Sequence, residues 1–226
     1  MKLCSYVVRY DHGFAPNPYW GYCTMACCKA PLRLNLTVND WVVGTSSKTR
    51  HGTGSFFVYA MRITELLSFD EYAKDTRFVN KIPRYGSIEQ RGDNIYYRDE
   101  QGIFRQRVPS YHSRGLNRIR EGSQDKWIIQ RPWEEHEGRK AKDLGGKNVP
   151  ISSSDNFWYF GCGKELPEEF RWVIFGTQGY KCDFSKSQVD RLLNWIASME
   201  PGKHGEPCDF NRTPLISSEH WKYIPS

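Results

Sequence analysis

One stretch, from Asp40 to Tyr72, constrains the fold more than any other part of the chain, because it holds the signals of two strands in a single run. Residues 41–43 are a short apolar segment, and residues 57–63 alternate between two faces, with aromatic and β-branched side chains that are typical of strands. Between them, residues 44–54 contain three glycines and many hydroxyls and predict a flexible loop. This order predicts a small curved β-sheet.

Two capping boxes predict helices. Ser68 stands three residues before Glu71, and Ser185 stands three residues before Gln188, which is the spacing at which the two side chains satisfy each other's backbone amides. After Ser185, apolar residues recur at helical spacing: Val189, Leu192, Leu193 and Ile196. We therefore expect an α+β fold with a few covering helices, including a C-terminal amphipathic helix.

The chain is long enough for one sizeable core, and its eight Trp and thirteen Tyr are not typical of disorder. We expect a single domain over residues 1–226. Residues 113–148 are the most polar part, with nine Lys or Arg and six Asp or Glu, and predict an excursion on the surface.

The cysteines and the absence of membrane signals bear on location. The seven cysteines are odd in number and irregularly spaced, and Met1 and Lys2 are followed at once by strand-like sequence rather than by a signal peptide. These features predict reduced thiols and a cytoplasmic protein. No apolar run approaches the roughly 20 residues of a membrane span, so we expect no membrane partner.

Residues 10–29 concentrate reactive groups. Asp11 could act as an acid or base, and Cys28 beside Lys29 could be a reactive thiol. Asn17, held between two prolines, could read a base edge or a phosphate. The alternative, favoured by spacing alone, is a proline-rich loop with locally satisfied polar groups and cysteines in the core.

Other polar clusters are weaker candidates. Residues 44–48, which include Thr45 and Lys48, could offer amides and hydroxyls to a phosphate or simply form a hairpin tip. His112 follows a predicted strand and is a minority candidate for catalysis, since a histidine there is more often a capping residue. No Cys-x-x-Cys pair occurs, so we expect no metal site, and the sequence identifies no cofactor.

Cations and aromatic rings alternate between Lys74 and Arg107, within which residues 93–98 and 102–107 predict a hairpin. Cations that hold phosphates and rings that stack bases are the means by which proteins commonly bind single strands and flipped bases. A net charge of +6 permits a polyanionic partner without requiring one. A solvated charged surface around an aromatic core explains the pattern equally well.

The sequence resembles a family of bacterial and phage proteins, those with the nucleotide modification-associated domain of the second type. The residues that carry the resemblance are spread over about three quarters of the chain. They are residues 5–11, 13–18, 21–24, 28–29, 40–45, 58–62, 69–72, 92–96 and 157–161. The resemblance implies association with systems that make or handle modified nucleotides or DNA bases, together with other proteins of such a system. It gives no support to Cys27 or to residues 113–147 as functional elements.

The order of strands also looks like the small β-barrels of the PUA superfamily, whose EVE, ASCH and YTH domains accept a modified base in a pocket. By this analogy the sheet would be a PUA-like barrel. A nucleotide or modified base in DNA would then be bound by three sets of side chains. The stacking residues would be Trp41, Tyr59 and Tyr96, the edge-reading residues Asn17, Asp93 and Asn94, and the phosphate-binding residues Lys29 and Lys48.

Two other hypotheses stay open beside this binding protein. One is an enzyme that alters or hydrolyses the nucleotide or base through Asp11, Cys28 or His112. The other is a structural partner in a modification complex, without a site of its own.

Overall fold

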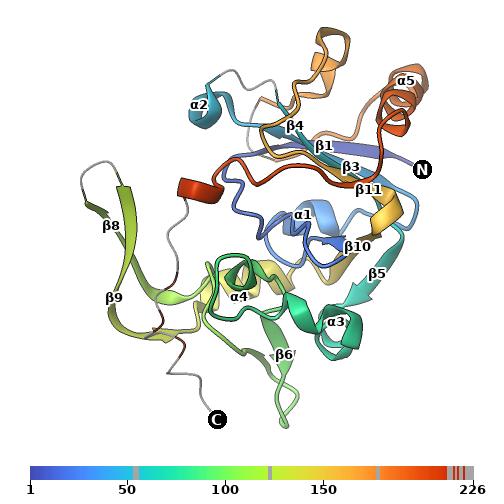
Figure 1. Cartoon of the computed structure of the whole chain (residues 1–226). Helices are drawn as coiled ribbons and strands as arrows, with labels where there is room; N and C mark the ends of the chain where they lie inside the picture. The colour runs from blue at the N-terminus through green and yellow to red at the C-terminus, as the bar shows by residue number, and fades with distance from the viewer. Residues whose placement is uncertain are drawn as a thin grey trace.

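A computed structural model describes residues 1–52, 56–121, 124–176 and 179–212, together with residues 216, 218 and 221. For residue 50, residues 115–121 and residues 124–132 the description covers the backbone alone. The fold is α+β, as predicted, with short helices around mixed sheets (Figure 1). None of the described helices is long and apolar enough to cross a membrane.

The main sheet has five strands in the order β1-β3-β4-β11-β12. Their bounds are β1 Leu3–Val8, β3 Trp41–Ser46, β4 Phe57–Arg62, β11 Phe157–Tyr159 and β12 Gly202–Lys203. β1 runs parallel to β3, with Leu3 opposite Trp41, and β4 is antiparallel to β3. The predicted strands at 41–43 and 57–63 are confirmed. The predicted loop at 44–54 is wrong in part, because β3 continues to Ser46 and a short helix follows.

A second sheet has the order β2-β10-β5, and two hairpins accompany the sheets. The strands of the second sheet are β2 Tyr22–Thr24, β10 Asn148–Ser153 and β5 Glu65–Ser68. The hairpins are β6 Tyr96–Arg98 with β7 Phe104–Gln106, and β8 Arg114–Glu121 with β9 Gln124–Glu134. The first hairpin confirms the prediction for residues 93–107.

Short helices connect the strands in the described part of the chain. The α-helices are α1 Ala30–Arg33, α2 Lys48–His51, α3 Phe69–Lys74, α4 Glu137–Leu144 and α5 Lys186–Ala197. The 3-10 helices are Thr76–Lys81, Glu89–Arg91, Ser154–Asn156, Glu168–Val173 and Phe210–Arg212. Both predicted capping boxes are present, at Ser68 on α3 and at Ser185 on α5.

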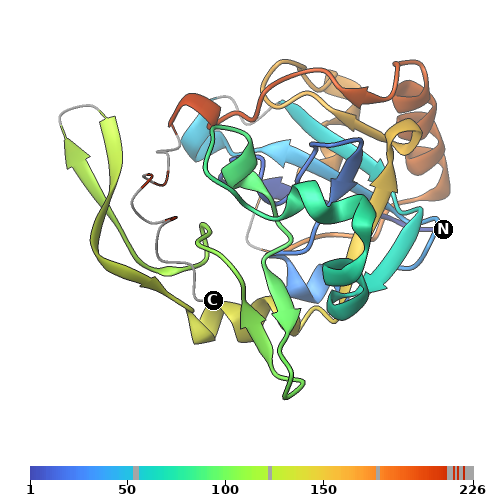
Figure 2. The ribbon, with the colours of Figure 1, turned by 60° about the horizontal axis from the view of Figure 1, so that its bottom comes forward.

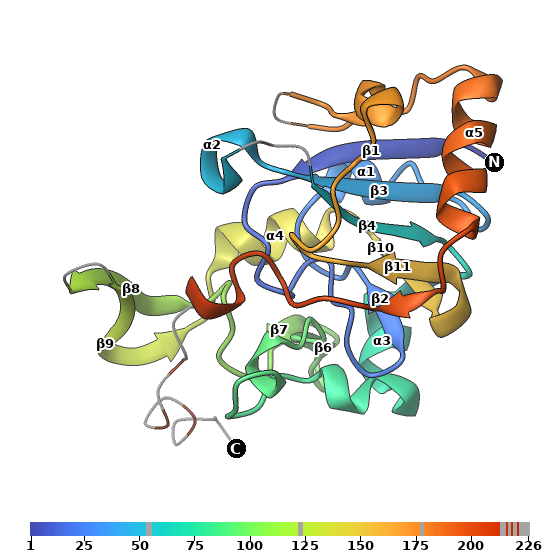
Figure 3. The same ribbon diagram turned by 45° about the horizontal axis from the view of Figure 1, so that its top comes forward.

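The two faces of the main sheet are covered by different elements (Figure 3). On one face Leu192 and Ile196 of α5 pack against the sheet, where Trp41 stacks on Trp158 with ring centroids 5.6 Å apart. On the other face lie α1 and the second sheet, and this interface contains Tyr6 and Tyr59. A third apolar cluster lies between the second sheet, α3 and the first hairpin.

The predicted PUA-like barrel is wrong. Within the described residues β1 and β12 lie at opposite edges of the main sheet, so the sheet is open. β11 has three residues and β12 two, which leaves little edge with which to close a barrel. The sheet instead covers its apolar faces with α5 on one side and the second sheet on the other.

The prediction that all seven thiols are reduced is also wrong. Cys4 is bonded to Cys182 and Cys162 to Cys208, whereas Cys23, Cys27 and Cys28 are free. The two bridges join positions 178 and 46 residues apart. Pairing at such separations depends on the tertiary structure, which the cysteine spacing does not reveal.

The polar segment at residues 113–148 divides into two parts. The backbone of β8 and β9 forms a hairpin that projects from the body of the molecule (Figures 1 and 2). The chain then returns through α4, whose Asp143 is buried. Its burial brings α4 into contact with the candidate site.

Candidate active site

Three side chains from distant parts of the sequence form a hydrogen-bonded chain. The Sγ atom of Cys28 lies 3.5 Å from Nε2 of His112, and Nδ1 of the same ring lies 2.6 Å from Oδ2 of Asp143. Cys28 follows β2, His112 lies in the turn before β8, and Asp143 lies on α4. A thiol, an imidazole and a carboxylate in this order are the components of cysteine-based nucleophilic catalysis.

The backbone at Cys28 and Lys29 adopts a conformation that residues other than glycine rarely take. Its φ angle is 61° and that of Lys29 is 45°, both in the left-handed region. The amide of Cys28 donates to Oδ1 of Asp143 at 2.8 Å, and Arg33 Nε donates to the carbonyl of Cys28 at 2.9 Å. Strained backbone held by its surroundings is found most often at functional sites.

Arg33 and Tyr96 both donate hydrogen bonds to Asp143 and so fix its position. Arg33 is fully buried and also donates to the carbonyls of Asp143 and Asn148. The hydroxyl of Tyr96 donates to Oδ2 of Asp143 at 2.9 Å. Each oxygen of the carboxylate is thus engaged, one by the Cys28 amide and the other by Tyr96 and His112.

The imidazole is held in its protonated form. Burial lowers the pKa of His112, but the hydrogen bonds and charges of Asp143 and Cys28 raise it more, to about 9. Burial alone would raise the pKa of Asp143, yet its hydrogen bond to His112 brings this pKa below the ordinary value. At neutral pH the two groups are therefore an ion pair with 13% and 2% of their side chains exposed.

The Cys28–His112–Asp143 chain lies in the wall of a cavity of about 930 Å³. Cations outnumber acids among the described residues that line it, since Asp143 is the one carboxylate there and five Lys or Arg side chains accompany the His112 imidazolium. The five are Arg9, Lys29, Lys48, Arg139 and Lys142. The ammonium of Lys29 lies 4.4 Å from the centre of the Tyr6 ring, and burial lowers its pKa. Such a cavity fits an anion such as a phosphate.

Four of the residues predicted from the sequence line this cavity: Cys28, Lys29, Lys48 and His112. Tyr96 lies behind it and contacts Asp143, so it supports the site instead of stacking on a ligand. Asp11 does not line the cavity. It is 1% exposed, accepts from Tyr159 and from the Cys208 amide, and has its pKa raised by burial.

The three predicted edge-reading residues are occupied inside the protein. The Asn17 amide donates to two backbone carbonyls and accepts from Lys81 at 2.6 Å. Asp93 accepts from Thr24, Tyr72 and the Ala26 amide. Asn94 donates to two backbone carbonyls. All three side chains are at most 1% exposed. Their hydrogen bonds connect segments of the chain inside the protein.

The predicted stacking residues and Thr45 are core residues. Trp41 packs under α5, and Tyr59 is fully buried with its hydroxyl donating to Tyr6 at 2.9 Å. Thr45 is fully buried in β3. The basic and aromatic segment from Lys74 to Arg107 is also partly interior. Its Lys81 and Arg91 are at most 1% exposed, so they cannot meet a nucleic acid as predicted.

Sequence reasoning missed Asp143 and Arg33, as well as the cavity residues Arg9, Arg139 and Lys142. No local sequence pattern distinguishes these residues from the other charged residues of the chain. Asp143 stands 115 positions after Cys28 in a polar helix, so no spacing connects the two. Only the docking of α4 against α1 brings them together.

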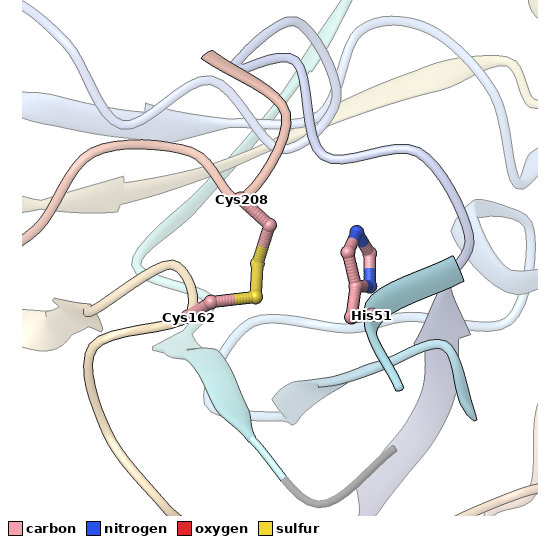
Figure 4. Close-up of side chains that lie close together, drawn as sticks. All are labelled: His51, Cys162 and Cys208. Carbon is pink, nitrogen blue, oxygen red and sulfur yellow. A yellow bond between two sulfur atoms is a disulfide. The ribbon is translucent and has the colours of Figure 1, made fainter. Parts of the chain in front are cut away.

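Two clusters in the described part of the chain have a geometry that could suit a metal, although none was predicted. In one, ligand atoms of Cys27, His112 and Asp143 lie within 4.8 Å of one another. His112 and Asp143 are already paired with each other there, and the Arg33 guanidinium is adjacent. The other comprises His51, Cys162 and Cys208, but its two sulfurs are bonded to each other as a disulfide (Figure 4).

Comparison with known proteins gives a single result. No curated protein and no solved structure matches the chain. A family model does match, over residues 1–214 of the 226. The chain therefore belongs to the family described as nucleotide modification associated domain 2.

Proposed function

We propose that this protein is an enzyme of a nucleotide modification system and that Cys28 is its nucleophile. The observation that carries the proposal is the Cys28–His112–Asp143 chain in the wall of a cation-lined cavity. The family description supports nucleotides as the class of substrate. The five cations support a substrate that bears phosphate.

The chemistry follows from the groups present. Cys28 passes its thiol proton to Nε2 of His112, and its sulfur attacks an electrophilic carbon of the substrate to form a carbon–sulfur bond, while the bond to the leaving group breaks. His112, whose raised pKa lets it hold this proton at neutral pH, then gives it from Nε2 to the leaving group. A second nucleophile then displaces the sulfur. With water the outcome is hydrolysis, and with another acceptor it is group transfer.

Asp143 and Arg33 act through the other residues. Asp143 holds the His112 ring with Nε2 toward the sulfur and stabilises the imidazolium. Arg33 fixes the carbonyls of Cys28 and Asp143 and so holds the segment before α1 against helix α4. Lys29 and Lys142, which lie beside Cys28 and Asp143 in the sequence, would hold the phosphate near the sulfur.

A second candidate function is nucleotide binding without catalysis, in which the same cavity holds the ligand and Cys28 only lines it. The excess of cations around the cavity favours this candidate as much as the first. The hydrogen bond between Cys28 and His112 favours catalysis, since a binding site alone does not require it.

The test uses alkylation of Cys28 by iodoacetate, an anionic reagent that the cations should attract. We expect mass spectrometry to show modification of Cys28 well before Cys23 or Cys27, which are fully buried. Deoxynucleoside monophosphates should protect Cys28, and short oligonucleotides should do so only if the substrate is a polymer. Cys23→Ser is the matched control and should leave the labelling of Cys28 unchanged.

Turnover separates the two candidates. The protein is incubated with a panel of nucleotides and then analysed by intact mass for a covalent adduct, and the nucleotides are analysed for new products. An enzyme should lose adduct and product in Cys28→Ser while the variant still binds nucleotide. Protection of Cys28 without any adduct or product would support the binding protein. Slow labelling that no nucleotide affects would reject the cavity as the site.

A further inference from the structure

Tyr180 is the one Tyr, Phe or Trp among the described residues that line the cavity of the proposed active site. Its side chain is half-buried and packs against the apolar cluster that contains Tyr6 and Tyr59. We propose that Tyr180 stacks on the base of the nucleotide and so distinguishes nucleotides from other phosphate compounds. This role rests on the proposed function, because it takes the ligand of the cavity to be a nucleotide. It adds a subsite for the base to the cations that hold the phosphate.

The cavity is larger than a phosphate group requires. Its volume of about 930 Å³ lies near the upper end of the range, roughly 300–1,000 Å³, over which protein pockets enclose whole organic ligands. Apolar side chains share its wall with the cations: Val7, Pro31, Leu32 and Ile174. A phosphate gains nothing from these side chains, whereas proteins bury the faces of a base between aromatic and apolar side chains. The lining therefore suits a ligand with both parts.

Two hydrogen bonds hold the hydroxyl of Tyr180. The side-chain amide of Asn35 donates to it at 2.7 Å, and the hydroxyl donates to the carbonyl of Pro31 at 3.3 Å. The Asn35 amide also donates to the Pro31 carbonyl at 2.8 Å, so the three groups form a closed network. The end of the ring is thus fixed before a ligand binds. A side chain that is already ordered loses little conformational entropy on binding.

The backbone after Tyr180 is fixed to the main sheet. The amide of Lys181 donates to the carbonyl of Ser5 at 2.9 Å, and the amide of Ser5 donates to the carbonyl of Lys181 at 2.8 Å. The next residue, Cys182, is bonded to Cys4 of the same strand, β1, at the edge of the sheet. The ring is therefore carried by a segment paired with the sheet, as a preformed binding wall requires.

Lys29 connects this wall with the reacting sulfur. It follows Cys28 directly in the sequence, and its Nζ atom donates to the carbonyl of Gly179, the residue before Tyr180, at 3.2 Å. A phosphate bound by Lys29 is therefore close both to Cys28 and to the segment that carries the Tyr180 ring. Stacking on an aromatic side chain tolerates every base, since each base has a π-face. Tyr180 thus selects for the presence of a base and not for one particular base.

The test compares two compounds, a deoxynucleoside 5′-monophosphate and deoxyribose 5-phosphate, which lacks the base. Each is titrated for protection of Cys28 against iodoacetate. In the wild type the nucleotide should protect at a concentration lower by about 5- to 150-fold, the equivalent of about 1–3 kcal/mol. Tyr180→Ala should remove this advantage and leave protection by deoxyribose 5-phosphate unchanged. Because stacking is not ionic, the advantage of the nucleotide should not change with salt.

Two matched variants and one structural check accompany this test. Tyr180→Phe keeps the ring and should keep most of the advantage of the nucleotide. Tyr85→Ala removes a tyrosine that is 60% exposed and does not line the cavity, so it should change nothing. Peptide mapping of Tyr180→Ala should still find the Cys4–Cys182 bond, which shows that the segment stays on the sheet.

Three results would overturn the role of Tyr180 and leave the proposed function standing. One is a Tyr180→Ala variant that keeps the full advantage of the nucleotide. Another is a wild type that both compounds protect equally. The third is an equal loss of protection by both compounds in Tyr180→Ala, because Tyr180 would then only shape the cavity. Failure of the proposed function looks different, since neither compound would protect Cys28 even in the wild type, and the role of Tyr180 would fall with it.

Discussion

Nδ1 of His112 lies 2.6 Å from Oδ2 of Asp143, and this contact connects the turn before β8 with the last turn of α4. The same carboxylate receives the amide of Cys28 and the hydroxyl of Tyr96. One buried acid therefore joins three segments and sets the charge of the imidazole that faces the sulfur. The first two predictions test this relationship.

Asp143→Asn preserves the shape of the side chain and removes its charge. Burial lowers the pKa of His112, and the hydrogen bond to Asp143 does most to raise it, so we expect this pKa to fall from about 9 toward the ordinary value of 6.5. An NMR titration of the His112 ring measures this change. Alkylation of Cys28 and any turnover should also slow, by about 10²-fold or more for turnover. An unchanged titration would mean that Asp143 does not hold the proton on His112.

The raised pKa of His112 also predicts how stability depends on pH. The folded pKa, about 9, exceeds the unfolded value of 6.5, so the folded state binds the proton more tightly. The stabilisation is complete below pH 6.5 and is lost as the pH rises through 9. The difference in melting temperature between the wild type and His112→Gln should therefore shrink over this window. His204→Gln, the control, should show no such trend, and a constant difference for His112→Gln would contradict the prediction.

The cavity cations should determine the affinity for phosphate. Lys29→Ala and Lys142→Ala each remove one positive charge from the cavity wall. We expect both to weaken protection of Cys28 by deoxynucleoside monophosphates, and to weaken it most at low salt. Lys186→Ala removes the same charge from an exposed position on α5 and is the control. If a labelled single strand binds, log affinity should fall with log salt at a slope of about −0.7 per phosphate contact, and Lys29→Ala should reduce that slope.

Helix α5 should contribute to stability through the residues that it buries. Leu192 is fully buried against the main sheet, so Leu192→Ala should cost about 2–5 kcal/mol in the free energy of unfolding. Leu193 is only partly buried, and Leu193→Ala should cost less. Denaturant unfolding of both variants measures the difference. Equal costs would show that the helix is not docked through Leu192.

Sequence reasoning identified the elements whose signals are local. It located both capping boxes, the strand pair at residues 41–62, the first hairpin and α5. It also selected Cys28, Lys29, Lys48 and His112, which line the cavity. Six residues predicted as ligand contacts are buried in the structure, because polar or aromatic type does not reveal whether a side chain faces inward. These are Asn17, Asp93, Asn94, Trp41, Tyr59 and Thr45.

The sequence by itself determined the secondary structure at these elements and the membership of the family. A capping box closes between residues three apart and a strand alternates with period two, so neighbours along the chain are enough to specify them. Only the tertiary structure decided which side chains meet. The Cys28–His112–Asp143 chain, the two disulfides and the His51 cluster join residues far apart in the sequence. Such contacts depend on how α4, α2 and the loop at Cys208 pack, because burial and docking are properties of the whole fold.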